Sequence, residues 1–112
     1  MKLITAVFTP SEFEAVKKAL DIFGITGLTI TEVFQRDLAG LGRDQIYRGQ
    51  RFHADLLPHV RIELITPDHD ITDLIHIITK LTSPRACPER IWITPVETVT
   101  RVRTGERGLD AL

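Results

Sequence analysis

The sequence predicts a single α+β domain, in which a four-stranded antiparallel sheet carries two helices on one face. Two segments repeat apolar residues at helical spacing, and four short segments are rich in β-branched residues. Their order along the chain is β-α-β-β-α-β, which is the order of the ferredoxin-like fold. Since 112 residues leave room for one hydrophobic core, the whole chain, 1–112, is expected to form one domain.

The first half of the chain is expected to form a strand, a helix and a second strand. LITAVF, Leu3 to Phe8, is an apolar run typical of a buried strand. SEFE, Ser11 to Glu14, has the spacing of a capping box, and Gly24 is the expected stop of the helix. LTITEV, Leu28 to Val33, is the second strand. The apolar face of the helix comprises Phe13, Val16, Leu20 and Phe23.

The second half repeats the pattern. VRIELIT, Val60 to Thr66, alternates as a third strand, and IWITPV, Ile91 to Val96, is the fourth. Between them Asp68 or Asp70 can cap a second helix. The helical positions of that segment are Ile71, Leu74, Ile75, Ile78 and Leu81.

The connection between the second and third strands has a different character. Residues 36–55 contain three glycines, scattered charges and no sustained period. A connection of this length without regular structure is uncommon in a small domain unless it is functional, so we interpret it as a functional loop. The sheet face opposite the helices has no cover in this plan, and its apolar residues favour a homo-oligomer packed sheet to sheet.

Composition and motifs exclude several classes of protein. A net charge of -1 lacks the basic face that nucleic-acid binders need, and no apolar run reaches the roughly 18 residues of a membrane span. The start of the chain has no signal-peptide pattern, and the lone Cys87 cannot form an internal disulfide, so a cytoplasmic protein is expected. Cys87 has no evident base beside it, and the histidines lack the pair spacing of a metal site, so we expect no catalysis, metal or cofactor. The four histidines are His53, His59, His69 and His76.

Two arginines near the end of the chain leave two interpretations open. RVRTGERG places Arg101 and Arg103 two residues apart, and on a short extra strand over ETVTRVRT both side chains would share one face. Two neighbouring guanidinium groups suit a phosphate or carboxylate, and Arg90 could add a third positive charge. The alternative is a solvated charged strand with Glu97 and Glu106 as partners.

With these stretches in view, the chain resembles the PII signal-transduction proteins, the nitrogen regulatory P-II family, along nearly its whole length. The resemblance implies a non-enzymatic homotrimer of the same fold, with adenine nucleotide bound in clefts between subunits. It also implies that the loop at residues 36–55, the T-loop of that family, reaches a partner protein. The matching stretches are GITGLTITEV at 24–33, YRG at 47–49, DLLPHVRIEL at 55–64, PD at 67–68 and RVRTGERG at 101–108.

Carried over by position, the resemblance assigns site residues. Thr29 would touch the adenine, and Arg101 and Arg103 would reach the phosphates from the neighbouring subunit. Arg90 stands where the family has a phosphate-binding lysine. The slot around the adenine would be lined by Leu28, Glu63, Leu64 and Ile65.

The chain also departs from the family pattern. The loop before the fourth strand, SPRACPER at 83–90, has prolines where the family has phosphate-cradling glycines. This predicts weaker or altered triphosphate binding, with a preference for ADP or AMP over ATP. RDLAG at 36–40 lacks the glutamine that ligates magnesium, and His59 replaces the lysine that pairs with 2-oxoglutarate. Phe52 replaces the tyrosine that some bacterial members use for uridylylation, which leaves Tyr47 as a remote substitute.

The prediction is therefore a PII-like regulator with an altered second effector. Inorganic carbon, sensed as bicarbonate in transport or carboxysome function, is favoured over 2-oxoglutarate, and the regulated partner would be a membrane transporter or a metabolic enzyme. The first alternative is a conventional nitrogen regulator that responds to ATP and 2-oxoglutarate; the second is a trimeric metal-binding protein or enzyme of ferredoxin-like fold. The residues assigned to the second effector or partner loop are Arg36, Gly40, Gly42, Arg43, Tyr47, Arg48, Arg51 and His59.

Overall fold

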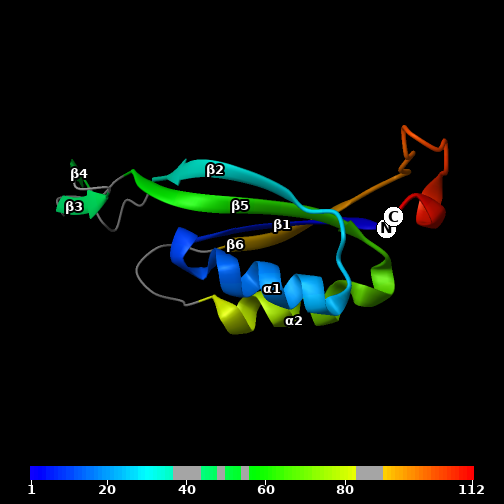
Figure 1. Ribbon diagram of the computed structural model, residues 1–112, viewed down its shortest axis with the longest axis horizontal. Helices are drawn as coiled ribbons and strands as arrows, with labels where there is room; N and C mark the ends of the chain where they lie inside the picture. The colour runs from blue at the N-terminus through cyan, green and yellow to red at the C-terminus, as the bar shows by residue number, and fades with distance from the viewer. Residues whose placement is uncertain (37–43, 48–49, 54–55, 83–89) are drawn as a thin grey trace.

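Four strands form one antiparallel sheet, and two helices pack on one of its faces (Figure 1). The computed structural model describes residues 1–36, 44–47, 50–53, 56–82 and 90–112. The strand order across the sheet, β2-β5-β1-β6, together with the chain order confirms the predicted ferredoxin-like arrangement. The strands are β1 (Lys2–Phe8), β2 (Thr29–Gln35), β5 (Leu57–Thr66) and β6 (Arg90–Pro95).

The first helix, α1, spans Phe13–Phe23, and its entry differs from the prediction. The capping box predicted at residues 11–14 is wrong, because a 3-10 turn at Pro10–Glu12 precedes the helix and moves its start. The Thr9 hydroxyl donates instead to the Glu12 carboxylate, and the Glu12 amide donates to the Thr9 carbonyl at 3.1 Å. Both bonds lie within the 3-10 turn, and neither caps the start of α1.

The predicted end of α1 is confirmed. Gly24 has a φ of 108°, and its amide donates to the Leu20 carbonyl at 3.1 Å. Glycine adopts this left-handed conformation without the steric cost that a side chain would bring.

The second helix, α2, spans Ile71–Leu81 and follows a 3-10 turn at Asp68–Asp70. Asp70 occupies the N-cap position of α2, as predicted, but its side chain forms no cap hydrogen bond, and Asp68 lies at the start of the 3-10 turn. The Asp68 carboxylate instead lies 2.9 Å from the amino group of Met1, which ties the start of β1 to this turn. Among the described residues, no helix is long and apolar enough to cross a bilayer.

The core lies between the sheet and the helices, where alternate residues of β1 and β5 meet both helices. The open face of the sheet is mixed in character. Trp92 and Ile65 are partly exposed, whereas the Arg61 guanidinium lies 3.4 Å from the Glu63 carboxylate. Coverage of this face by another subunit thus stays a prediction. The buried core residues are Ile4, Ala6, Phe8, Val16, Leu20, Val60, Ile62, Leu64, Leu74 and Ile78.

The connection between β2 and β5 contains regular structure that the sequence pattern did not predict. Strands β3 (Asp44–Tyr47) and β4 (Gln50–His53) pair antiparallel as a separate two-stranded sheet, with Tyr47 opposite Gln50. Figure 1 shows this sheet beyond the ends of β2 and β5, away from the helices and from the end of the chain. The strands are short and polar, which explains why alternation did not mark them.

Candidate functional site

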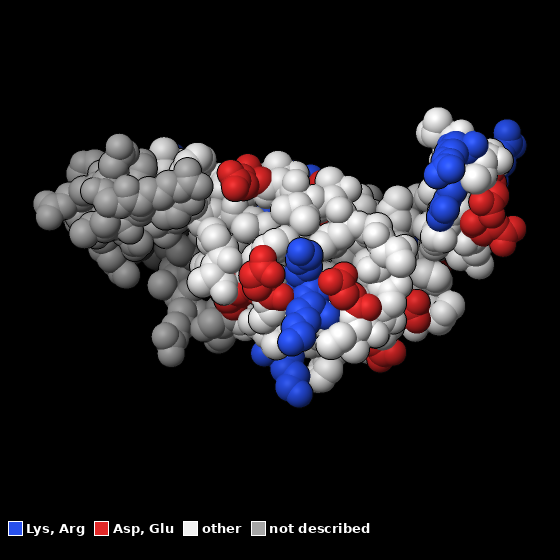
Figure 2. Space-filling view, viewed as in Figure 1, with Lys and Arg blue, Asp and Glu red and all other residues white. Residues whose placement is uncertain are grey.

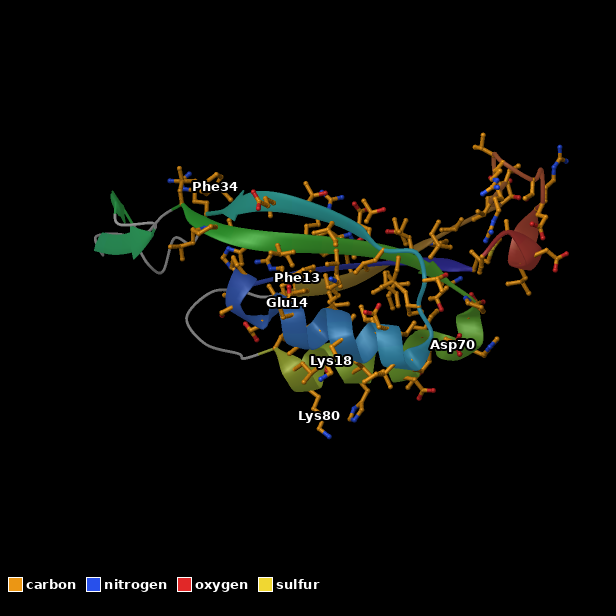
Figure 3. The ribbon with its side chains drawn as sticks, in the orientation of Figure 1. Phe13, Glu14, Lys18, Phe34, Asp70 and Lys80 are labelled. Atoms are coloured by element: carbon orange, nitrogen blue, oxygen red, sulfur yellow. The ribbon has the colours of Figure 1, made fainter. Side chains whose placement is uncertain are left out.

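A pocket of about 560 Å³ lies where β2 begins, and we call it the β2–β5 pocket. Its walls are the loop at residues 24–29, the end of β5 with the turn after it, and the C-terminal segment. Figure 3 shows Asp70, which lines this pocket, and Phe34, near the end of β2, toward opposite ends of the molecule. The pocket is thus distant from the β3–β4 sheet (Figure 1).

The sheet register explains which predicted residues meet in this pocket. Thr29, the first residue of β2, is the direct partner of Glu63, and β5 continues beyond this pair to Thr66. The pocket brings together all five residues predicted to surround an adenine, together with Arg101. These residues are Leu28, Thr29, Glu63, Leu64 and Ile65.

The pocket combines apolar walls with a small number of polar groups. Leu64 is buried in the core behind the pocket, and Ile65, which is partly exposed, offers apolar surface to a ligand. Thr29 supplies a hydroxyl, while Glu63 and Asp70 supply carboxylates. A pocket of this volume and composition suits a flat, mostly apolar ligand with a few hydrogen-bonding atoms.

The C-terminal segment corrects the prediction for the two arginines. Arg101 and Arg103 do not lie on a strand: the Arg101 amide donates to the Glu106 carbonyl at 2.8 Å, and the Gly105 amide donates to the Arg101 carbonyl at 2.7 Å. These bonds close a tight turn, which Gly105 permits with a φ of 76°. Spacing of two residues therefore does not place the two guanidinium groups on one strand face.

Arg101 and Arg103 also differ in location. Arg101 lines the β2–β5 pocket of its own chain, whereas Arg103 is not among the described residues that line it. Figure 2 shows the arginines of this turn gathered with acidic side chains on a projection at one end of the molecule. Arg101 was expected to come from a neighbouring subunit, but it already lines the pocket of its own chain; for Arg103 that origin stays a prediction.

The Arg101 guanidinium is held by the main chain. Its Nε and Nη2 atoms donate to the Ala111 carbonyl at 3.3 and 3.2 Å. Ala111 is 8% exposed, and it lines the β2–β5 pocket with Leu112. The C-terminal residues therefore contribute both a wall of the pocket and the partner of its arginine.

Arg90 lies apart from this pocket. It begins β6 opposite Val7 and lines a second pocket of about 410 Å³ between β6 and α2. β6 and β2 are the two edges of the sheet, so three strand spacings, about 14 Å, separate them. One chain therefore does not bring Arg90 and Thr29 together.

The family profile described as Nitrogen regulatory protein P-II matches residues 1–106. The chain belongs to this family. It is a PII signal-transduction regulator rather than an enzyme, and the alternative of a metal-binding protein or enzyme is not supported. The described residues contain no group of three histidine, cysteine, aspartate or glutamate side chains suited to a metal.

Individual PII relatives agree with the family match. The chain is 38% identical to the Nitrogen regulatory protein P-II of Azospirillum brasilense, and the alignment covers all of both chains. It is also 38% identical to Nitrogen regulatory protein P-II 2 of Methanothermobacter thermautotrophicus, over all of this chain and 97% of the relative. A third, from Rhizobium meliloti, is 36% identical over the whole of both.

His59, which the resemblance aligns with a 2-oxoglutarate-binding lysine of the family, is 2% exposed. It lies on β5 opposite Val33, near the end of β2. Its Nδ1 lies 3.0 Å from the Leu57 carbonyl, and its Nε2 has no hydrogen-bond partner among the described residues. The side chain is thus enclosed rather than presented to solvent.

The other residues assigned to the second effector or partner loop are only partly described. Arg36 follows β2 and is exposed, Tyr47 lies in β3 and Arg51 in β4. The remaining predictions in this loop lie outside the described residues, as does the segment 83–89. Those loop residues are Gly40, Gly42, Arg43 and Arg48.

Several pocket residues carry no local signal in the sequence. Ala111 and Leu112 reach the pocket because the chain turns back at Gly105 and Gly108, and these glycines were the one available hint. The position of Asp70 before α2 indicates a helix cap, and its wide separation from Thr29 along the chain hides that both line this pocket.

Proposed function

We propose that this PII-family regulator binds an adenine nucleotide in the β2–β5 pocket and controls a partner protein through the loop at residues 36–55. The observation that supports the proposal is that Thr29 pairs with Glu63 and that all five residues assigned to the adenine slot line one pocket. The pocket volume of about 560 Å³ is in the range of small-molecule sites.

The charges of the pocket favour one orientation of the nucleotide. Glu63 and Asp70 repel phosphates, so the base lies beside Thr29 and Glu63, where a carboxylate accepts a hydrogen bond from an amino group. The phosphates need positive charge, and Arg101 is the arginine that lines the pocket.

A homotrimer would supply the remaining cations. Arg103 and Arg90 lie away from the pocket of their own chain, so a neighbouring subunit would bring them to the phosphates. The nucleotide would then bind the assembled trimer more tightly than one chain. A cytoplasmic location belongs to the same proposal.

The strands that line the pocket also provide a route to the loop. β2 and β5 run from the Thr29–Glu63 pair to the Gln35–Leu57 pair, about 20 Å along the sheet, where the connection containing β3 and β4 begins. Nucleotide binding would shift the population of loop conformations through the paired strands β2 and β5. A transporter or metabolic enzyme would bind one of these loop conformations in preference to the others.

The expected preferences for nucleotide and for the second effector follow from the positions where this sequence departs from the PII family pattern. The prolines of SPRACPER remove backbone donors, which favours ADP or AMP over ATP. The enclosed His59 supports loss of 2-oxoglutarate sensing, since a buried imidazole does not offer the exposed cation that pairs with a carboxylate. Bicarbonate is the second effector that we favour.

A conventional nitrogen regulator is the second candidate. The observation that favours it is that its relatives are named nitrogen regulatory proteins. That candidate requires tight coupling between magnesium-ATP and 2-oxoglutarate.

Calorimetry separates the two candidates. AMP, ADP and ATP are titrated alone and then with bicarbonate or 2-oxoglutarate. We expect ADP or AMP to bind at least as tightly as ATP, with bicarbonate changing the affinity and 2-oxoglutarate leaving it unchanged. Strong mutual enhancement of ATP and 2-oxoglutarate would reverse the assignment of the second effector.

A further inference from the structure

The C-terminal segment returns to the β2–β5 pocket by a defined path. Thr100 forms a bridge with Arg107, and the Gly108 amide donates to the Val99 carbonyl at 2.9 Å. A 3-10 helix, η4 (Gly108–Ala111), then carries the chain to the pocket wall. Figure 1 shows this segment folded back beside the start of β1.

The contact between Arg101 and Ala111 uses the part of the guanidinium that recognises anions. Nε and one terminal nitrogen form one edge of the arginine fork, which binds two oxygens of a phosphate or carboxylate. Both of these atoms donate to the single Ala111 carbonyl. While that contact persists, this edge of Arg101 is not available to a ligand.

The remaining contacts of residues 110–112 are few. Ala111 is buried, Leu112 is 37% exposed, and the Leu112 amide donates to the Leu109 carbonyl at 3.2 Å. A segment with so little buried surface opens at low free-energy cost. It can therefore be displaced by a ligand that offers Arg101 a charged partner.

We infer that residues 110–112 form a self-inhibitory strap, which occupies the wall of the β2–β5 pocket and the anion-binding edge of Arg101 until a nucleotide phosphate displaces it. The inference rests on the proposed nucleotide function of this pocket. The strap lowers the affinity for nucleotide and makes release of Arg101 part of binding.

The test compares ADP binding by the full chain and by a chain that ends at Leu109. Loss of the strap should tighten ADP binding about three- to tenfold, the range expected for removal of one competing hydrogen bond. With Arg101→Ala in both backgrounds, the truncation should have no further effect on affinity. Equal or weaker binding by the truncated chain would overturn the strap.

A full-length variant provides a second test in case the truncated chain does not fold. Ala111→Glu places a charge at a buried position and should lift the strap, with the same gain in ADP affinity. Leu109→Ala is the matched control, because Leu109 is 63% exposed and is not among the described residues that line the pocket. A gain in affinity with Leu109→Ala, or none with Ala111→Glu, would contradict the inference.

Hydrogen exchange of the Leu112 amide gives an independent readout. ADP should accelerate exchange at this amide in the full chain, whereas slower or unchanged exchange at saturation would overturn displacement. If neither the full chain nor the truncated chain binds AMP, ADP or ATP, the proposed function itself fails and the strap falls with it. If the full chain binds nucleotide and truncation does not tighten it, the strap alone fails.

Discussion

Thr29 and Glu63 are direct partners across β2 and β5, and both line the pocket at the start of β2. Residues separated by more than thirty positions in the chain thus form one corner of a ligand site. The pairing places a hydroxyl and a carboxylate side by side at this pocket, where we propose that both contact the same base.

Replacing Thr29 by alanine should weaken ADP binding about two- to tenfold, since one hydrogen bond contributes about 0.5–1.5 kcal/mol. Thr29→Ser keeps the hydroxyl and should retain most of the affinity. Thr72→Ala, at an exposed position of α2, is the control outside the pocket. Calorimetry measures all three, and undiminished binding by Thr29→Ala would remove the hydroxyl from the site.

Glu63 should determine the choice of base. A carboxylate accepts from the amino group of adenine but repels the carbonyl oxygen of hypoxanthine, so ADP should bind more tightly than inosine diphosphate. Glu63→Gln supplies both a donor and an acceptor, and it should reduce this preference several-fold.

The matched control for Glu63→Gln is Glu32→Gln, a carboxylate on β2 that is not among the described residues lining the pocket. Competition between the two nucleotides gives the ratio directly. The assignment fails if Glu63→Gln leaves the ratio unchanged, or if Glu32→Gln alters it equally.

Mixed trimers test whether the site is shared between subunits. Arg103→Ala removes a phosphate ligand, and Thr29→Trp blocks the pocket, so neither variant should bind ADP well alone. Random mixing of refolded chains in equal amounts should restore about a quarter of the sites, because a neighbour can then supply the missing arginine. If trimers that are shown to contain both variants bind no ADP, Arg103 does not belong to a site shared between subunits.

The fold was predictable because the helix and strand patterns of the individual segments agree with the order of elements in a ferredoxin-like fold. The apolar face of α1, the stop at Gly24 and the four strands were all visible in the sequence, and five slot residues assigned by family resemblance meet in one pocket. The strand over Arg101 and Arg103 was wrong because Gly105 closes a turn that residue spacing does not reveal. Chain reversal also brought Ala111 to the pocket, a long-range contact with no sequence period.

Asp68 should make stability depend on pH in the acidic range. The hydrogen bond from the Met1 amino group, assisted by the nearby charge of Lys2, lowers the pKa of Asp68 below its ordinary value of 3.8. The stabilisation is fully present above the ordinary value and is lost as pH falls through the lowered pKa. Asp68→Asn should therefore be less stable than the unmodified chain at neutral pH, with the difference vanishing in acid.

Urea unfolding at a series of pH values measures this difference. Asp21→Asn, an exposed carboxylate on α1, is the control and should show no comparable pH-dependent loss. If Asp68→Asn still lowers the free energy of unfolding by the same amount at the lowest pH, the ion pair with Met1 is not the origin of the loss.

Two glycines before β2 should respond differently to alanine. Gly24→Ala places a side chain at a φ of 108° and should lower the free energy of unfolding by about 1 kcal/mol. Gly27→Ala has no positive φ and no atom within 4 Å of the added carbon, so its stability should change by less than about 0.5 kcal/mol. Equal losses in denaturant unfolding would contradict the role of Gly24 as the helix stop.

Photolabelling with 8-azidoadenosine diphosphate tests the central claim most directly, because it identifies the residues beside the base. The account predicts labelling of peptides that contain residues 24–29 or 63–70, suppressed by excess ADP and weakened by Thr29→Trp. Labelling confined to the pocket between β6 and α2, or no labelling that ADP can suppress, would contradict nucleotide binding in the β2–β5 pocket.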